Sequence, residues 1–214
     1  MDHQQQLAMF EGMSYEVECA FHPVVTGHVG TNAELLAQVF RLHVSLGSTV
    51  ADVTYGRGAM WAKLDHGQYR LLKSDLLTGV DLRDLPYEPQ SVDVLILDPP
   101  YAHGGQTMKA SINDCYCNQN GNHESVVKLY EDGLREGVRV LRKGGLALVK
   151  CQDEIESGKQ RFTHVEVMHL LESLGFEVVD LFVLVQLSQP TMRLKYQKSA
   201  RKNHSYLLVG RRRK

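Results

Sequence analysis

Long apolar runs and a targeting segment are both missing from this 214-residue sequence. No stretch approaches the roughly 20 apolar residues that a membrane-spanning helix needs. The amino end, Met1 to Gln6, lacks the basic region followed by an apolar core that marks a signal peptide. We therefore expect a cytoplasmic protein that makes no membrane contact.

Cysteine is also scarce, and the four cysteines are Cys19, Cys115, Cys117 and Cys151. Two disulfides would suit a secreted chain, but nothing else in the sequence indicates secretion. Cys115 and Cys117 lie near His123, yet their spacing is unusual for zinc and no second cysteine pair is present. We expect free thiols in a loop and no bound metal.

The small net charge of -1 hides a strong asymmetry. Residues 193–214 hold nine basic side chains and no acidic one, whereas the other residues have 15 basic and 25 acidic side chains. Such a local excess predicts contact with a polyanion such as a nucleic acid. Residues 211–214 are typical of a frayed, solubilising end, so the expected contact segment is 186–204. Its candidate contact residues are Arg193, Lys195, Lys198, Arg201 and Lys202.

Helical and strand patterns alternate along most of the chain. After a loose arm at 1–20, the spacing predicts helices at 32–42, 123–140 and 164–174, with Asn32 capping the first, and a short helix after residue 58. Apolar runs predict strands at 49–54, 69–73, 91–97, 146–150, 176–185 and 205–209, with a turn at Gly144-Gly145. Residues 102–123 form a long polar loop, of a length that is usually functional or disordered. We expect an α/β fold in a single domain over 21–214: a doubly wound, mostly parallel sheet with an antiparallel hairpin at its C-terminal edge.

Polar segments follow three of the predicted strands, at the edge where doubly wound sheets bind their ligands. In the first, Asp52-Val53-Thr54-Tyr55-Gly56-Arg57-Gly58, the glycines let a ligand approach the backbone, although a tight strand-to-helix turn is the alternative. Asp52 either holds this loop or meets a cationic part of a cofactor. Asp75 follows the next strand, where a carboxylate can accept hydrogen bonds from ribose hydroxyls. Asp81 or Asp84 is a candidate contact to the adenine amino group of a cofactor, or a solvated loop acid.

The third segment, Asp98-Pro99-Pro100-Tyr101, carries the most specific chemistry. Two prolines impose an extended, stiff backbone and remove two N–H donors. The amine of a nucleobase is a poor nucleophile because its lone pair is delocalised into the ring. If the Asp98 carboxylate and the Pro99 carbonyl accept both amine hydrogens, the nitrogen becomes more tetrahedral and its lone pair can attack a methyl group. Tyr101 can stack on a base that has been flipped out of a duplex.

This combination of motifs resembles the amino methyltransferases that make N6-methyladenine or N4-methylcytosine in DNA. The resemblance covers about residues 21–210 and rests on the G-x-G loop, the Asp98-Pro-Pro-Tyr motif, the Arg142-Lys143-Gly144-Gly145 turn and the ending Asn203 to Val209. It implies the Rossmann-like fold of class I enzymes that depend on S-adenosyl-L-methionine. An aspartate in the first motif position is more typical of the adenine enzymes, so the resemblance favours adenine N6 and favours DNA over RNA. The sequence departs from the family pattern in having Tyr55 for phenylalanine and Arg57 between the glycines.

The resemblance also assigns candidate site residues. A further cofactor element is expected near residues 26–32, where a helix N-terminus can receive the cofactor carboxylate; a capped surface helix is the alternative. The expected catalytic residues are Asp98, Pro99, Pro100 and Tyr101. The expected cofactor-binding residues are Thr31, Asn32, Asp52, Thr54, Tyr55, Gly56, Gly58, Asp75, Asp81 and Asp98.

Other interpretations stay open at this stage. The chain could methylate N4 of cytosine or an amine in RNA, or it could be an inactive nucleic-acid-binding module; protein glutamine methyltransferases usually begin the motif with asparagine. A large target-recognition domain is absent, so residues 102–123 and 186–204 would read the target, with help from a homodimer or another partner. Lys150 and Gln152 lie at the same edge and could line the cleft, but a lysine at a strand end is commonly solvent-exposed, so we do not expect Lys150 to be catalytic.

Overall fold

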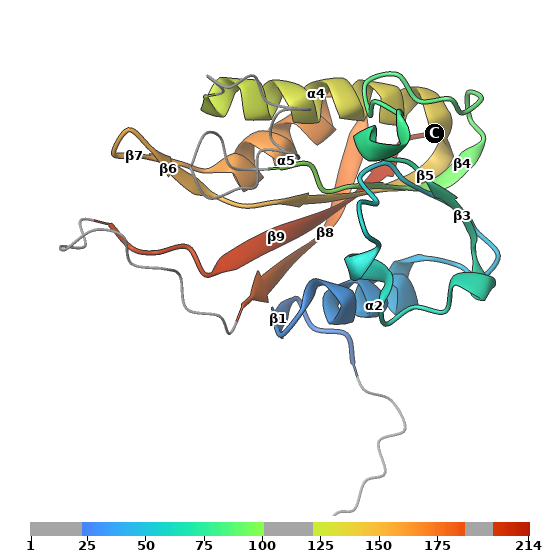
Figure 1. Ribbon diagram of the computed structural model, residues 1–214, viewed down its shortest axis with the longest axis horizontal. Helices are drawn as coiled ribbons and strands as arrows, with labels where there is room; N and C mark the ends of the chain where they lie inside the picture. Colours follow the sequence, from blue (N-terminus) through green and yellow to red (C-terminus); the bar gives the residue numbers. More distant parts are fainter. Residues whose placement is uncertain (1–22, 101–121, 187–198) are drawn as a thin grey trace, which may run out of the picture.

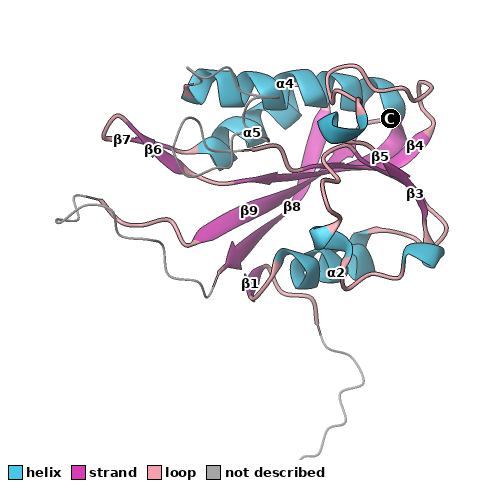
Figure 2. Cartoon of the chain, viewed as in Figure 1, coloured by secondary structure: helices cyan, strands magenta, loops and turns pink. Residues whose placement is uncertain are grey.

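The computed structural model describes residues 23–100, 122–186 and 199–214. The α-helices are α2 (Asn32–His43), α4 (His123–Val140) and α5 (Thr163–Ser173), and short 3₁₀ turns are η1 (Ala59–Trp61), η2 (His66–Gln68) and η3 (Leu76–Thr78). The strands are β1 (Gly27–Val29), β2 (Thr49–Asp52), β3 (Arg70–Lys73), β4 (Val92–Leu97), β5 (Leu141–Cys151), β6 (Glu154–Glu156), β7 (Lys159–Arg161), β8 (Phe176–Val185) and β9 (His204–Arg212). Figure 2 shows their distribution along the chain.

A seven-stranded sheet of order β1-β8-β9-β5-β4-β2-β3 forms the centre of the fold. Its strands pair in parallel except for β9, which is antiparallel to both β5 and β8. The predicted hairpin of the last two long strands is confirmed, but it is not added at an edge. Strand β9 is inserted between β5 and β8, and β1 pairs beyond β8, so both hairpin strands have two neighbours.

Helices cover both faces of this sheet (Figure 1), with α4 and α5 on one face and α2 on the other. The alternation of strand residues divides the core accordingly. On β4, Leu95 and Leu97 pack toward α4, whereas Val94 and Ile96 pack toward α2. The nearly unbroken apolar sequence of β4 therefore reflects a strand that is buried on both faces, as its pattern predicts.

Two glycines in the middle of α4 let this helix lie close to the sheet. A Cβ atom at Gly133 would lie 3.2 Å from Leu97 Cδ1, and one at Gly137 would lie 2.8 Å from Leu95 Cδ2, both on β4. Glycine normally destabilises a helix interior. Here the close contact with the sheet explains why no larger residue fits.

The structure corrects three local predictions. The helix α2 is capped by Thr31 rather than by Asn32: Thr31 Oγ1 accepts from the Glu34 N–H, and Glu34 returns a bond to the Thr31 N–H, which is a capping box. The strand predicted at 49–54 ends at Asp52. The predicted glycine turn at 144–145 is a bulge inside β5, where Gly144 has a φ of 80° and the pairing with β4 shifts register.

Three short strands have no counterpart in the sequence predictions. Each of β1, β6 and β7 has three residues, too few for an alternating pattern to emerge. The β6–β7 hairpin forms a second, two-stranded sheet. Within the described residues, none of the helices is both long enough and apolar enough to span a membrane.

Candidate active site

A row of three charged side chains lies across adjacent strands at the carboxyl edge of the sheet. Ile96 on β4 is in register with Asp52 on β2 and with Leu148 on β5. Two residues further along β4 and β5 come Asp98 and Lys150. Asp52 is 2% exposed and Lys150 is 1% exposed, so charged groups are buried here side by side.

Lys150 is the largest departure from expectation, because its side chain is buried rather than exposed to solvent. Its Nζ atom lies 3.7 Å from Asp98 Oδ1 and forms an ion pair with it. Its carbonyl oxygen accepts a hydrogen bond of 2.8 Å from the Tyr130 hydroxyl on α4. Sequence reasoning therefore missed a residue that contacts the central carboxylate of the site.

Asp98 sits at the end of β4 with an acceptor atom unused by the described residues. Its backbone N–H donates to Thr54 Oγ1 at 2.8 Å. The Oδ1 atom is buried and has no hydrogen-bond partner among the described residues. Burial raises the pKa of the Asp98 carboxyl, and the charge of Lys150 opposes this increase.

Asp52 ties the end of β2 to the loop that follows it. Its Oδ2 atom accepts a 2.7 Å hydrogen bond from the indole of Trp61, and its Oδ1 atom accepts one of 3.1 Å from the Thr54 N–H. Burial raises the pKa of Asp52 to about 6, against the hydrogen bonds from Trp61 and Thr54, and the nearby charge of Asp98 adds to the increase. Of the two sequence interpretations of Asp52, these contacts support the one in which it holds the loop.

The glycines of the G-x-G loop adopt conformations that favour glycine. Gly56 has a φ of 51° and Gly58 a φ of 71°. A Cβ atom at Gly58 would lie 2.5 Å from the Tyr55 hydroxyl, so the aromatic ring lies directly against this residue. Lys73 places its ammonium 4.9 Å from the centre of the same ring. Arg57, between the glycines, is exposed and does not crowd the loop.

Asp75 fastens this loop from the neighbouring strand. Its Oδ2 atom accepts from the Gly56 N–H at 3.0 Å, and its Oδ1 atom accepts from the Leu77 N–H at 2.9 Å and caps η3. Each carboxylate oxygen keeps a second lone pair, so ribose contact by Asp75 remains a prediction. Asp81 is bound at both oxygens by Arg83, chiefly through side-chain hydrogen bonds that lower the pKa of Asp81.

The N-terminus of α2 contributes a further unpartnered acceptor. Thr31 uses its side chain in the capping box, so it is occupied within the helix end. Asn32 is not the cap, and its Oδ1 atom is buried without a hydrogen-bond partner among the described residues. A buried polar atom of this kind is normally satisfied by a ligand or water.

Several predicted residues cannot be placed. Tyr101, most of the 102–123 loop, Arg193, Lys195 and Lys198 lie outside the described residues, as do Cys115 and Cys117. Pro99 is buried, and Pro100, Arg201 and Lys202 are half-buried. Within the described ranges, no three His, Cys, Asp or Glu side chains are arranged to hold a metal ion.

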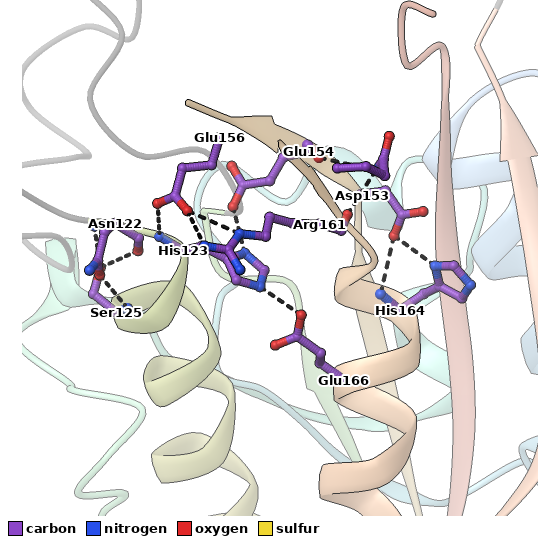
Figure 3. Close-up of polar contacts among 10 residues, drawn as sticks. Asn122, His123, Ser125, Asp153, Glu154, Glu156, Arg161, His164 and Glu166 are labelled. Carbon is purple, nitrogen blue, oxygen red and sulfur yellow. Dashed lines mark hydrogen bonds and ion pairs between the residues drawn. The ribbon is translucent and has the colours of Figure 1, made fainter. Parts of the chain in front are cut away.

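A second cluster of charges surrounds the start of α4 (Figure 3). The ring of His123, the first residue of this helix, is 3% exposed and contacts two carboxylates: Nδ1 lies 2.8 Å from Glu154 and Nε2 lies 2.8 Å from Glu166. The Glu156 carboxylate accepts from the His123 N–H and also pairs with Arg161. The cluster joins α4, α5 and the β6–β7 hairpin immediately after the Asp98 motif and its following loop.

We call these five residues, His123, Glu154, Glu156, Arg161 and Glu166, the His123 clamp. Sequence reasoning missed this clamp, since the segment 152–161 shows neither helical nor strand periodicity. The only local signal was Ser157-Gly158, a typical turn pair. Beside the clamp, Asp153 accepts a 2.6 Å hydrogen bond from the His164 ring, which stacks on Tyr206.

Comparisons with known proteins give matches among solved structures only. No protein-family model matches the chain, and no curated protein sequence matches it. The Burkholderia thailandensis 1,6-didemethyltoxoflavin-N1-methyltransferase, solved with S-adenosylhomocysteine, aligns over 86% of this chain and 79% of its own, with 16% identity and a TM-score of 0.54. TrmN from Thermus thermophilus aligns over 84% of this chain and 48% of its own, with 17% identity and a TM-score of 0.52.

A proposed DNA modification methylase from Thermus thermophilus, solved with S-adenosyl-L-methionine, aligns more weakly. The alignment covers 63% of this chain and 54% of that one, with 18% identity and a TM-score of 0.44. This chain thus spans about half the length of that protein, and we draw nothing further from the alignment. The two stronger likenesses, together with the sheet order, show that the chain has the Rossmann-like fold of class I S-adenosyl-L-methionine-dependent methyltransferases.

Proposed function

We propose that this protein is an S-adenosyl-L-methionine-dependent methyltransferase that acts on the exocyclic amine of a nucleobase, with adenine N6 in DNA as the favoured target. One observation carries the proposal. The Asp98 carboxylate ends the central strand β4 beside the G-x-G loop and keeps a buried acceptor atom without a hydrogen bond from the described residues. This is the group that the chemistry requires to accept an amine hydrogen.

The residues present fit the cofactor. The buried row of Asp52, Asp98 and Lys150 holds two carboxyl groups and one ammonium, so its ionised form has one excess negative charge that favours a cationic ligand. Asn32 offers an unpartnered acceptor at the start of α2, which suits the ammonium group of the cofactor, and Gly56 and Gly58 leave the loop backbone accessible. When bound, S-adenosyl-L-methionine supplies a methyl group activated by a sulfonium.

The chain's own residues prepare the amine for attack. Asp98 and the Pro99 carbonyl accept the two amine hydrogens, and the prolines offer no competing N–H. The nitrogen lone pair then forms the new N–C bond while the C–S bond breaks, and one amine proton leaves toward Asp98 or water. Alignment of the two reactants lowers much of the barrier. Thr54 maintains this alignment because its hydroxyl joins the loop after β2 to the Asp98 backbone.

The identity of the polymer rests on basic residues near the same edge of the sheet. Arg201 and Lys202 lie in the segment that leads into β9, whose first residue, His204, is at the same edge of the sheet as Lys150. They continue the basic run of Arg193, Lys195 and Lys198. Such a run suits phosphate contact, and Tyr101 is proposed to stack on the flipped base. Methylation of cytosine N4 or of RNA remains the second candidate.

The test is transfer of radiolabelled methyl to duplex DNA, single-stranded DNA and RNA, followed by nucleoside analysis. We expect N6-methyladenine in DNA; label only in N4-methylcytosine would refute the adenine assignment, and label only in RNA would refute the DNA assignment. Asp98→Ala should abolish transfer while calorimetry still detects cofactor binding. Glu177→Ala, at an exposed position near the opposite end of β8, is the control and should retain activity. Failure of the wild-type protein to bind the cofactor would instead favour an inactive module.

A further inference from the structure

Lys150 occupies an unusual place for a lysine. Among the described residues it is the only lysine with a buried side chain. Taking an ammonium out of water is costly unless an opposite charge lies close to it. Asp98 provides such an opposite charge for Lys150, so the two groups must be considered together.

The backbone fixes the direction of the Lys150 side chain. Strand residues alternate between the two faces of the sheet, and Leu146 and Leu148 on β5 pack toward α2. Lys150 follows them on the same face, as Asp98 follows Val94 and Ile96 on β4. The hydrogen bond from Tyr130 to the Lys150 carbonyl holds this end of β5 against α4.

The separation of 3.7 Å has a chemical consequence. It is short enough for a strong electrostatic effect but longer than a normal hydrogen bond of about 2.7–3.2 Å. Each carboxylate oxygen has two lone pairs, so an ion pair with Lys150 leaves Asp98 Oδ1 with a lone pair that is not used. The acceptor atom stays available for a substrate amine.

The surroundings of Asp98 shift its pKa in opposite directions. Burial raises its pKa, and Lys150 on β5 lowers it. Asp52 on β2 is a second acid within electrostatic reach, since Asp98 raises its pKa. The Cys151 thiol on the other face of β5 also senses both Asp98 and Lys150, and burial holds its pKa far above the ordinary value. Lys150 is the nearby cation that lowers the pKa of Asp98, against the effects of burial and of the neighbouring acid Asp52.

We propose that Lys150 is a positioning residue that keeps the Asp98 carboxylate ionised and directed as an amine acceptor. This inference rests on the proposed methyl transfer. A protonated Asp98 would offer its hydroxyl as a donor to the amine and lose its strength as an acceptor. The lysine acts through Asp98 and does not itself touch the reacting atoms.

The experiment compares wild-type protein with Lys150→Met, Lys150→Gln and Lys150→Arg in two measurements. The first is the pH dependence of kcat/KM for methyl transfer, whose acidic limb reports the free enzyme's essential base. The second is titration of the Asp98 side-chain carboxyl by ¹³C NMR, assigned with Asp98→Asn, which needs no activity. Lys143→Met is the matched control, because Lys143 is exposed at the other end of β5.

We expect the acidic limb and the Asp98 titration of Lys150→Met both to move upward by about 1–3 pH units, as removal of an adjacent opposite charge implies. Activity should recover at high pH, Lys150→Arg should keep both values near wild type, and Lys143→Met should change neither. Thermal unfolding verifies folding, and Lys150→Gln replaces Lys150→Met if the latter does not fold.

The outcomes separate the two proposals. An unmoved Asp98 titration overturns the inference. The inference is also overturned if the Asp98 titration moves in Lys150→Met but the acidic limb of kcat/KM stays in place, since the ion pair would then have only a structural role. If wild-type protein transfers no methyl group to any substrate, the proposed function fails, and with it the positioning role, whereas the NMR measurement still establishes whether Lys150 controls the ionisation of Asp98.

Discussion

The His123 clamp predicts a pH-dependent contribution to stability. Both ring nitrogens of His123 face carboxylate oxygens at 2.8 Å, from Glu154 and Glu166, and both can donate only when the ring is protonated. Burial opposes the charged ring. The hydrogen bonds and charges of Glu154 and Glu166 outweigh burial, so the pKa of His123 lies above its ordinary value of 6.5. Glu124 on α4, Glu156 on β6 and Arg161 on β7 are the other charged groups around this site.

The size of this contribution to stability follows from how exposed the two glutamate side chains are. The Glu154 side chain is 15% exposed, so its charged hydrogen bond to His123 is worth about 2 kcal/mol. The Glu166 side chain is 42% exposed, and its bond is discounted to about 1 kcal/mol for solvent screening. A group whose folded pKa is raised stabilises fully below its unfolded pKa and loses that stabilisation as pH rises through the folded pKa. The free energy of unfolding should therefore fall by up to about 1.4 kcal/mol per pH unit in the window that begins near 6.5.

The perturbation is His123→Gln, which keeps hydrogen-bonding capacity and removes the titration. At pH 6 we expect its free energy of unfolding to lie below that of wild type by up to about 3 kcal/mol, less what the amide's own hydrogen bonds retain, and the difference to shrink as pH rises above 6.5. Urea unfolding followed by far-UV circular dichroism, from pH 5.5 to 9 at constant ionic strength, measures it. The control is His169→Gln on α5, an exposed histidine 3.8 Å from exposed Glu172, for which the change should stay below about 0.5 kcal/mol. A wild-type to His123→Gln difference that is constant with pH would refute the reasoning.

Three further predictions concern the loop after β2. Trp61→Phe removes the indole N–H that binds buried Asp52. We expect urea unfolding to show a loss of about 1.5–3 kcal/mol that is smaller in the Asp52→Ala background, which has no acceptor for the indole. Because the pKa of Asp52 is raised from 3.8 to about 6, the folded protein binds the carboxyl proton more tightly than the unfolded chain does. The free energy of unfolding of wild type should therefore fall from pH 4 to 6 by up to about 3 kcal/mol relative to that of Asp52→Asn. Unfolding free energies of the two proteins that change in parallel with pH would contradict this. Gly58→Ala combines a φ of 71° with a contact of 2.5 Å to the Tyr55 hydroxyl, so it should weaken cofactor binding in calorimetry and lower the melting temperature more than Gly79→Ala does. Gly79 has a φ of 81° and open space around it, which isolates the cost of the backbone conformation, about 1–2 kcal/mol.

The long periodic elements of the fold could be predicted from the sequence because their patterns are local. The range predicted for α4 coincides with its observed bounds, since eight of its residues are buried at helical spacing. Strand β4 was equally clear as an apolar run. The N-cap of α2 was wrong by one residue, because Thr31 and Asn32 are both good caps and only Thr31 has Glu34 three positions later.

The site was predictable in its positions and less so in its contacts. The loops that hold Asp52, Asp75 and Asp98 follow strands, and parallel strands bring their carboxyl ends to one edge. The sequence could not show that Trp61 occupies one oxygen of Asp52 or that Gly56 occupies one oxygen of Asp75. Those contacts depend on how a loop of about ten residues folds back, which no periodicity encodes.

The location of the Lys150 side chain depends on the strand order of the sheet, which the alternating pattern of β5 does not reveal. Alternation along β5 assigns its face, but exposure depends on which strands lie beside β5. Of the two hairpin strands, β8 comes first after β5 in the chain and could equally have been its neighbour. Strand β9 instead pairs along β5, with Leu207 in register with Lys150, although the two residues are far apart in the sequence. Strand β9 therefore places Leu207 beside Lys150 on one side, and on the other side β4 leads to Asp98, whose carboxylate lies 3.7 Å from the ammonium. The neighbours of Lys150 thus come from strands that are distant in the sequence, so a lysine expected at the surface lies in the candidate active site.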